Sequence, residues 1–255
     1  MRIMLPCFKS KLLDQIPHIT HGFFTRNGGI SCGHYATLNT LERKTDNPQH
    51  VIENRRRIKN MLGFDALQFN NQTHSTMVHH ITEPGLVQDG DAMITQTPQL
   101  LIGIQTADCM PILIAHKTQP VVAAVHAGWK GSLSGIIQAT LDELKKICTI
   151  NDLVCVIGPC IAPEHYEIGE DVYQLAQKNG SSTANFALVK DDAPQKWHLD
   201  LRALADQIMQ DYGIVHIDHI EQDTYSQPEK FFSYRRETHT GEKICGGQAS
   251  VIGIL

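Results

Sequence analysis

Short apolar runs separated by polar turns recur along most of the chain and predict buried β-strands. In the middle of the chain, residues 110–115 and 121–125 are long enough for strands and too short for most helices. Pro120 separates these two runs, so we expect the two strands to lie side by side in one sheet. The same pattern predicts further strands at the start of residues 16–31 and at residues 78–81, 100–105, 153–158, 214–220, 231–234 and 248–254.

A second pattern, in which apolar residues recur every three or four positions, predicts four helices. The clearest one follows Asn47, which is a suitable N-cap; Pro48 fits its first position, and Gly63 ends it. The other three are predicted at residues 131–147, 169–178 and 199–209. Residues 179–196 are rich in Ser, Asn and Asp and are predicted to form a surface loop with one short strand. Many strands with a few interspersed helices favour an α+β or mixed α/β sandwich over strict βαβ alternation.

Length and charge limit the class of protein. A chain of 255 residues with 42% hydrophobic residues can bury a large core, and we predict one domain spanning residues 1–255. The formal net charge is −5 and the 22 Lys and Arg residues are scattered, so no basic stripe predicts a nucleic-acid partner. The chain has no run of 18 apolar residues and no segment typical of a signal peptide. We therefore expect no membrane partner and a cytoplasmic location.

The cysteine pattern is typical of reduced thiols. The seven cysteines are odd in number and include no C-x-x-C pair. Most of them are expected to be small core residues, such as Cys155 within the predicted strand at residues 153–158.

Three residues in the central part of the chain are candidates for chemistry. Cys109 and His126 adjoin the two central apolar runs, and His74 precedes them in a polar loop. One Cys and two His suit zinc, which takes three protein ligands and keeps an open position at catalytic sites. The same residues are compatible with a cysteine nucleophile activated by histidine, as in cysteine-dependent hydrolases. A copper site is a third hypothesis, because Met110 adjoins Cys109 and His₂Cys copper sites have a weak axial Met ligand. The repeated H-x-H pairs of multicopper oxidases are lacking, however.

Arginines provide the candidate anion sites. Arg235 and Arg236 stand in the segment FFSYRRE, and Arg26 precedes the turn Asn27-Gly28-Gly29. Guanidinium groups bind phosphate or carboxylate in bidentate fashion. A small molecule that carries phosphate is therefore compatible with this chain, because it needs only one or two local arginines. The alternative is that Arg235 and Arg236 are surface residues at a strand end.

Eight sequence blocks identify a resemblance that covers nearly the whole chain. They are HGFFTRNGGIS, GHYATLN, NQTHS, GDAMIT, TADCMPILI, AVHAGWKG, IGPCIAPEHYEIGEDV and FFSYRRETHTG. In this order they resemble the YfiH or laccase-domain family, whose members carry the older label polyphenol oxidase and are regarded as purine nucleoside enzymes. The resemblance implies a single-domain α/β/β/α sandwich and a zinc site formed by His74, Cys109 and His126.

The resemblance also implies substrates and an activity. The family reaction is phosphorolysis of adenosine, inosine and 5′-methylthioadenosine to the base and a ribose 1-phosphate, together with deamination of adenosine. The expected partners are therefore nucleosides and inorganic phosphate. Some bacterial relatives are described as peptidoglycan editing factors, which is an alternative role.

For this activity we also assign roles to residues outside the zinc trio. Asp108 is the candidate proton shuttle, and Arg235 and Arg236 would position phosphate. Arg26, Asn39 and Gln72 are candidate polar groups of the substrate pocket.

The chain departs from the family pattern at three places. Ser75 replaces the glycine of Q-V-H-G, Asp223 replaces the cysteine of a Cys-Thr pair, and Glu242 replaces the arginine of T-G-R. The first change retains the ligand His74 and alters the loop around it. The other two lie outside the zinc trio, and we expect them to affect substrate range and the local charge near Arg235 and Arg236.

Overall fold

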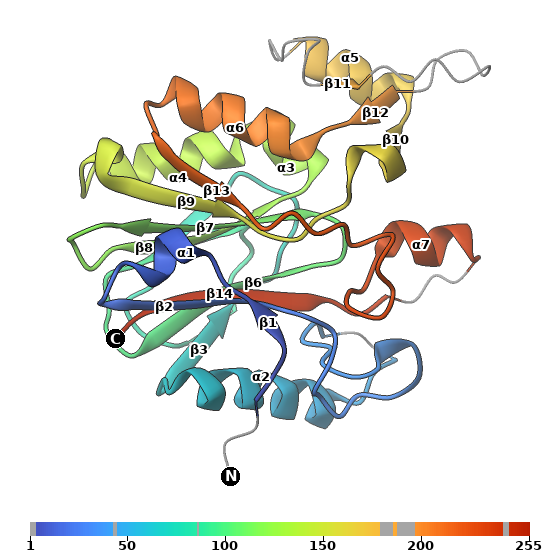
Figure 1. Cartoon of the computed structure of the whole chain (residues 1–255), viewed down its shortest axis with the longest axis horizontal. Coiled ribbons are helices and arrows are strands. Elements are labelled where there is room, and N and C mark those ends of the chain that lie inside the picture. The colour runs from blue at the N-terminus through green and yellow to red at the C-terminus, as the bar shows by residue number, and fades with distance from the viewer. Residues whose placement is uncertain (1–3, 43–44, 86, 179–185, 188–196, 242–244) are drawn as a thin grey trace.

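Two β-sheets stacked face to face form the centre of the molecule, and helices cover both outer faces (Figure 1). The computed structural model describes residues 4–42, 45–85, 87–178, 186–187, 197–241 and 245–255. Within these residues the layers follow the order helix, sheet, sheet, helix. The predicted α+β sandwich with mixed sheets is confirmed.

The lower sheet in Figure 1 has five strands in the order β1-β2-β14-β6-β3. They are β1 (Cys7–Phe8), β2 (Ile19–Phe24), β14 (Gln248–Ile254), β6 (Leu100–Thr106) and β3 (Ala66–Phe69). All neighbours are antiparallel except β3 and β6, which are parallel. The predicted closing strand β14 lies between β2 and β6, so the C-terminal segment completes this sheet.

The upper sheet has six strands in the order β13-β9-β7-β8-β5-β4. They are β13 (His216–His219), β9 (Leu153–Ile157), β7 (Met110–His116), β8 (Val122–Ala127), β5 (Ala92–Thr95) and β4 (Val78–His80). The pairs β13–β9 and β4–β5 are parallel, and the others are antiparallel. Every residue of β7 and β8 is buried, because the second sheet covers one face and helices cover the other. Apart from His116 and His126, both strands are therefore apolar runs without alternation.

Three apolar layers hold the sandwich together. Ile102 of β6 and Leu113 of β7 belong to the layer between the two sheets. On the outer face of the lower sheet, Leu101 packs in one cluster with Ile58 of α2 (Pro48–Leu62). On the outer face of the upper sheet, the third cluster includes Leu141 of α4 (Ile136–Lys145). Neighbouring residues such as Leu101 and Ile102 thus serve opposite faces of one sheet.

The helix at residues 48–62 is confirmed together with its boundaries. The Asn47 side chain accepts a hydrogen bond from the main-chain N–H of Gln49 (2.9 Å), and Pro48 occupies the first turn. Gly63 ends the helix with φ 84°, a left-handed conformation that favours glycine.

The single helix predicted at residues 131–147 is wrong. Two helices, α3 (Trp129–Ser134) and α4, occupy this region. Gly135 separates them with φ 101°, and its N–H donates to the carbonyl oxygens of Gly131 (3.0 Å) and Ser132 (3.3 Å). The helical spacing of apolar residues continues across the break, so periodicity alone does not show it.

A small outer sheet and two more helices complete the upper part. The sheet has the order β10-β12-β11, formed by β10 (Glu167–Ile168), β12 (Trp197–Leu199) and β11 (Phe186–Ala187). The helices predicted at residues 169–178 and 199–209 are confirmed as α5 (Glu170–Lys178) and α6 (Leu201–Asp211). Asp200 caps α6 by accepting from the N–H groups of Arg202 and Ala203. Strand β11 agrees with the short strand predicted within residues 179–196, and the rest of that stretch lies outside the described residues.

The strand predicted at residues 231–234 is also wrong. Phe231 and Phe232 are buried, but the Phe232 N–H donates to the side chain of Gln248 (2.9 Å) instead of a neighbouring strand. Ser233 then caps α7 (Tyr234–His239) by accepting from Arg236 N–H (3.2 Å). The remaining short elements are α1 (Lys11–Asp14), η1 (Gly33–Tyr35), η2 (Ile150–Asp152) and η3 (Pro163–His165).

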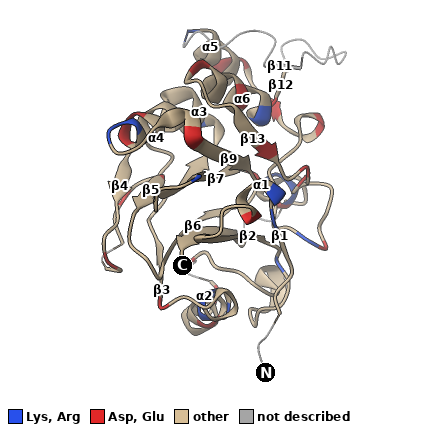
Figure 2. Ribbon diagram, turned by 60° about the vertical axis from the view of Figure 1, so that its left-hand side comes forward, with Lys and Arg blue, Asp and Glu red and all other residues tan. Residues whose placement is uncertain are grey.

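Charged residues are dispersed along the ribbon, and segments of both signs alternate in the view of Figure 2. Among the described residues, no helix has both the length and the apolar character needed to cross a bilayer.

Candidate metal centre

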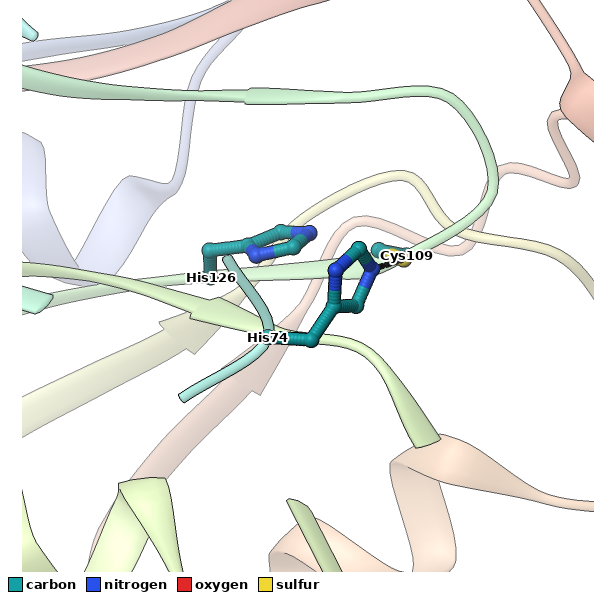
Figure 3. Close-up of side chains that lie close together, drawn as sticks. All are labelled: His74, Cys109 and His126. Atoms are coloured by element: carbon teal, nitrogen blue, oxygen red, sulfur yellow. Dashed lines mark hydrogen bonds between the residues drawn. The ribbon is translucent and has the colours of Figure 1, made fainter. Parts of the chain in front are cut away.

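His74, Cys109 and His126 meet where β7 begins and β8 ends (Figure 3). Strand pairing explains the meeting, because Pro111 of β7 lies directly opposite His126 of β8. Cys109 immediately precedes β7 in the turn from β6, and His74 comes from the loop between β3 and β4. The structure thus brings together His74 and Cys109, which are 35 positions apart along the chain.

The three side chains have a geometry that suits a metal ion. One ligand atom from each lies within 4.8 Å of the others. The Cys109 sulfur is 3.8 Å from His74 Nε2, and the two imidazole rings are 4.9 Å apart and nearly perpendicular. A tetrahedral zinc ion with ordinary bond lengths would separate sulfur and nitrogen by roughly 3.5 Å, so the Cys109–His74 pair needs little movement, whereas ligand atoms up to 4.8 Å apart would have to approach each other. Three protein ligands would leave a fourth position for a substrate or water.

Asp91, which directly precedes β5, organises two of the three ligands. One carboxylate oxygen is 2.7 Å from His126 Nδ1 and accepts from the N–H of His74 (3.0 Å). The other accepts from the N–H groups of Thr73 (3.2 Å) and Ser75 (2.6 Å) and from the Ser75 hydroxyl (2.7 Å). Because a carboxylate accepts only, His126 Nδ1 carries hydrogen and Nε2 is the nitrogen left for a metal.

Charge interactions within this cluster shift the pKa values of its members. Burial alone would raise the pKa of Cys109, but the charge of His126 and hydrogen bonds from His126 and His74 outweigh it and lower the pKa to about 6. Burial would lower the pKa of His126, but Cys109 and Asp91 raise it to about 9. For Asp91, burial is outweighed by the hydrogen bonds from His126 and Ser75, so its pKa is lowered. The cluster therefore favours a thiolate, which is the metal-binding form of cysteine.

Gly128 gives the ligands the space they need. A Cβ atom at this position would lie 2.8 Å from the Cys109 sulfur and 3.0 Å from His74 Cδ2. The small residues Ala127 and Gly128 beside His126 therefore allow close approach of neighbouring groups, and these groups are the ligands themselves.

Asp108 joins the turn that carries Cys109 to α7. Its carboxylate accepts from the hydroxyls of Thr224 (2.6 Å) and Ser233 (2.9 Å) and from the N–H of Arg235 (2.6 Å). The residue is only 7% exposed, and its φ of 87° places it in the left-handed region. These contacts are those of a structural anchor, and its role as a proton shuttle stays a prediction.

The five predicted substrate-binding residues bond mainly to the protein itself. Gln72 exchanges two hydrogen bonds with the main chain of Gln105 (2.7 and 2.8 Å), close to His74 in sequence. Asn39 is fully buried and bonds to Leu41 O, Asp46 and Gly247 N. The guanidinium groups of the arginines donate to main-chain carbonyls: those of Ala36, Pro228 and His34 for Arg26, His165 and Glu167 for Arg235, and Thr224, Tyr225 and Phe231 for Arg236. Their contact with a substrate stays a prediction.

Sequence reasoning missed Asp91, Thr224 and Ser233. Asp91 is marked by the block GDAMIT, in which a carboxylate directly precedes a wholly buried strand. The partners of Asp108 carry no comparable local mark, because they lie 116 and 125 positions away along the chain.

The fold and the site together define an α/β/β/α sandwich protein with a His-Cys-His group able to bind a metal ion. The family model described as multi-copper polyphenol oxidoreductase laccase matches residues 20–255. The chain belongs to this family.

Relatives and solved structures agree with this assignment. The chain is 37% identical over 222 residues to a purine nucleoside phosphorylase of Deinococcus radiodurans, covering 86% of this chain and 84% of that one. It is 32% identical to the purine nucleoside phosphorylase YfiH of Escherichia coli, covering 85% and 88%. A crystal structure of a Neisseria meningitidis protein matches with a TM-score of 0.87 and 30% identity over 98% of both chains. The structure of YlmD from Geobacillus stearothermophilus matches with a TM-score of 0.85 and 26% identity, over 94% and 93%.

Proposed function

We propose that the protein is a zinc-dependent purine nucleoside phosphorylase. Its substrates would be adenosine, inosine and 5′-methylthioadenosine, which phosphate converts to the base and a ribose 1-phosphate, and it would also deaminate adenosine to inosine. The observation that carries this proposal is the His74-Cys109-His126 cluster, within 4.8 Å, in a chain 37% identical to a relative named purine nucleoside phosphorylase.

The residues of the site divide into ligands and supports. His74, Cys109 and His126 would hold the zinc, which when bound supplies a Lewis acid at its open position. Asp91 keeps the His126 tautomer and the His74 loop in place through its hydrogen bonds. Sulfur and imidazole ligands suit zinc, and they also suit copper, so metal analysis is part of the test.

The test pairs metal analysis with product analysis. Purified protein is incubated with inosine with and without inorganic phosphate, and hypoxanthine and ribose 1-phosphate are quantified; adenosine is assayed for inosine formation in parallel. The Cys109→Ala variant should lose bound zinc and product formation together. Cys32→Ala is the matched control, because Cys32 is an exposed free cysteine. Full activity of Cys109→Ala would overturn the proposal, and zinc without nucleoside turnover would favour the editing-factor role.

A second candidate function is a cysteine-dependent hydrolase. It is favoured by the pKa values of about 6 for Cys109 and about 9 for His126, because such a pair holds a thiolate beside an imidazolium at neutral pH. The two candidates differ in their response to metal removal. A metal-free preparation that remains active and is inactivated by iodoacetamide would establish the hydrolase.

A further inference from the structure

A histidine and an aspartate form a second pair with catalytic chemistry, outside the candidate metal centre. His165 ends η3, and its Nδ1 lies 2.8 Å from Asp223 Oδ2. The Asp223 carboxylate is itself fixed, because it accepts from the N–H groups of Ala162 (2.9 Å), Tyr225 (3.1 Å) and Ser226 (3.0 Å). The carboxylate therefore has a defined position toward which the histidine ring turns.

This contact determines which nitrogen of His165 can meet a ligand. Nδ1 is buried and lies at ion-pair distance from the Asp223 carboxylate without forming a hydrogen bond of good geometry, so Nε2 is the nitrogen that can meet a ligand. The ring also stacks on Tyr225, with centroids 4.6 Å apart and an angle of 26° between the planes. The Tyr225 hydroxyl in turn lies 2.8 Å from His239 Nδ1. His165 is thus oriented from two sides while its side chain stays 36% exposed.

The pair is connected to the metal centre by one arginine. The main-chain N–H of Arg235 donates to Asp108, the neighbour of Cys109, and its guanidinium donates to the His165 carbonyl oxygen (3.3 Å). In Figure 1, α7 and the segment leading to β10 lie on the same side of the molecule as the turn between β6 and β7. One arginine side chain therefore spans the gap between His165 and the Cys109 turn.

We propose that His165, oriented by Asp223, is a catalytic residue that donates a proton from Nε2 to N7 of the purine as the base departs. This inference rests on the proposed phosphorolysis. An oxygen lone pair of hydrogen phosphate forms the new bond to C1′, the N9–C1′ bond breaks, and its electron pair passes into the purine, which accepts the proton at N7. The sugar phosphate then releases the proton brought in by hydrogen phosphate, which restores the imidazolium, so charge and atoms balance.

The chemistry of the surrounding side chains supports an imidazole in this role. Arg235 and Arg236 keep their guanidinium groups on main-chain carbonyls, and arginine does not give up its proton in proteins. Histidine is the side chain that most often transfers protons in enzymes, and a positioned general acid contributes about 10²–10⁴-fold to rate.

The test compares two substrates that differ in their need for a proton. Inosine needs protonation of its departing base, whereas 7-methylinosine carries a methyl group at N7 and releases a neutral base without it. His165→Asn should lower kcat for phosphorolysis of inosine by about 10²–10⁴-fold and leave kcat for 7-methylinosine within a few-fold of the wild-type value. Zinc content should be unchanged. A purely structural role would lower both rates alike.

The matched control is His219→Asn, which removes a histidine that also faces a carboxylate, with Nε2 3.0 Å from Asp206 Oδ1. It should keep both activities. If His165→Asn does not fold, Asp223→Asn provides the same test and should show a smaller loss that is again selective for inosine. Equal losses with both substrates, or no loss, would overturn the role of His165 alone. Failure of the wild-type protein to cleave either nucleoside would overturn the phosphorylase proposal and this inference with it.

Discussion

Gly128 is the residue beside the metal centre where a single methyl group should have the largest effect. In Gly128→Ala the new Cβ would lie 2.8 Å from the Cys109 sulfur and 3.0 Å from His74 Cδ2. Ordinary contacts between such atoms are about 3.5–4.0 Å, so the ligands must separate from the main chain by roughly 0.7 Å or more. Metal–ligand distances tolerate only about 0.2 Å. The main chain itself accepts alanine, because Gly128 has φ −74° and ψ 167°.

The expected magnitudes follow from these displacements. Overpacking a well-packed site costs about 1–3 kcal/mol of unfolding free energy. Displaced ligands should weaken zinc binding by at least about 10–100-fold, which is the effect of losing a group that orients the ligands. The variant is therefore expected to fold, with a lowered melting temperature, and to lose metal affinity and nucleoside turnover together.

Gly131→Ala is the control, because a Cβ there would meet its nearest neighbour, Ile136 Cγ2, at 3.4 Å. Gly131 lies within α3, where alanine is favoured over glycine by about 1 kcal/mol. Zinc affinity is measured by titrating metal-free protein in the presence of a competing chelator, and stability by thermal denaturation. Wild-type zinc affinity in Gly128→Ala would refute the reasoning that the absent side chain makes room for the ligands.

Three further predictions concern buried polar groups. The Asp91 carboxylate accepts five hydrogen bonds, and Asp91→Asn replaces one of its two oxygens with an NH2 group that cannot accept. Thermal denaturation should therefore show a loss of about 3 kcal/mol and zinc titration a weaker site, and an unchanged melting temperature would contradict this. His21 is fully buried, and burial lowers its pKa from 6.5 to about 4. As pH falls from about 6.5 to 4, the unfolded chain therefore binds a proton at His21 that the folded chain does not, which lowers the free energy of unfolding by up to about 3 kcal/mol. His21→Gln should flatten this part of the plot of unfolding free energy against pH, and identical plots for the two proteins would speak against the prediction. Asp108→Asn loses acceptor capacity for Ser233, Thr224 and Arg235, so it should destabilise α7 by about 1–3 kcal/mol. Hydrogen exchange of that helix measures the change, and exchange equal to that of the wild-type protein would exclude the anchoring role.

Local chemistry accounts for the parts of the fold that were predicted correctly. Strands β7 and β8 are buried on both faces, so apart from His116 and His126 their residues are apolar and the runs are visible in the sequence. Helix α2 carries its own boundaries in Asn47, Pro48 and Gly63, whose preferences come from the main chain near them. These features depend on contacts within a few residues.

One wrong prediction arose where a distant partner decided the outcome, and the other arose at a local break in a helix. Phe231 and Phe232 have the composition of a buried strand, but Gln248 takes the N–H of Phe232 and Ser233 starts a helix. The helix break at Gly135 is local, but it leaves the apolar spacing intact on both sides, so the spacing does not show it.

The sequence by itself determined which residue types were present for chemistry, namely two histidines and a cysteine beside buried strands, and it determined the layered class of the fold. Only the tertiary structure decided how the other polar residues are used. It directs the guanidinium groups of Arg235 and Arg236 to main-chain carbonyls and binds Asp108 to Ser233 across 125 positions of the chain. The physical reason is that a hydrogen bond depends on the position and direction of its partner in space, and local sequence specifies neither for residues that meet only after folding.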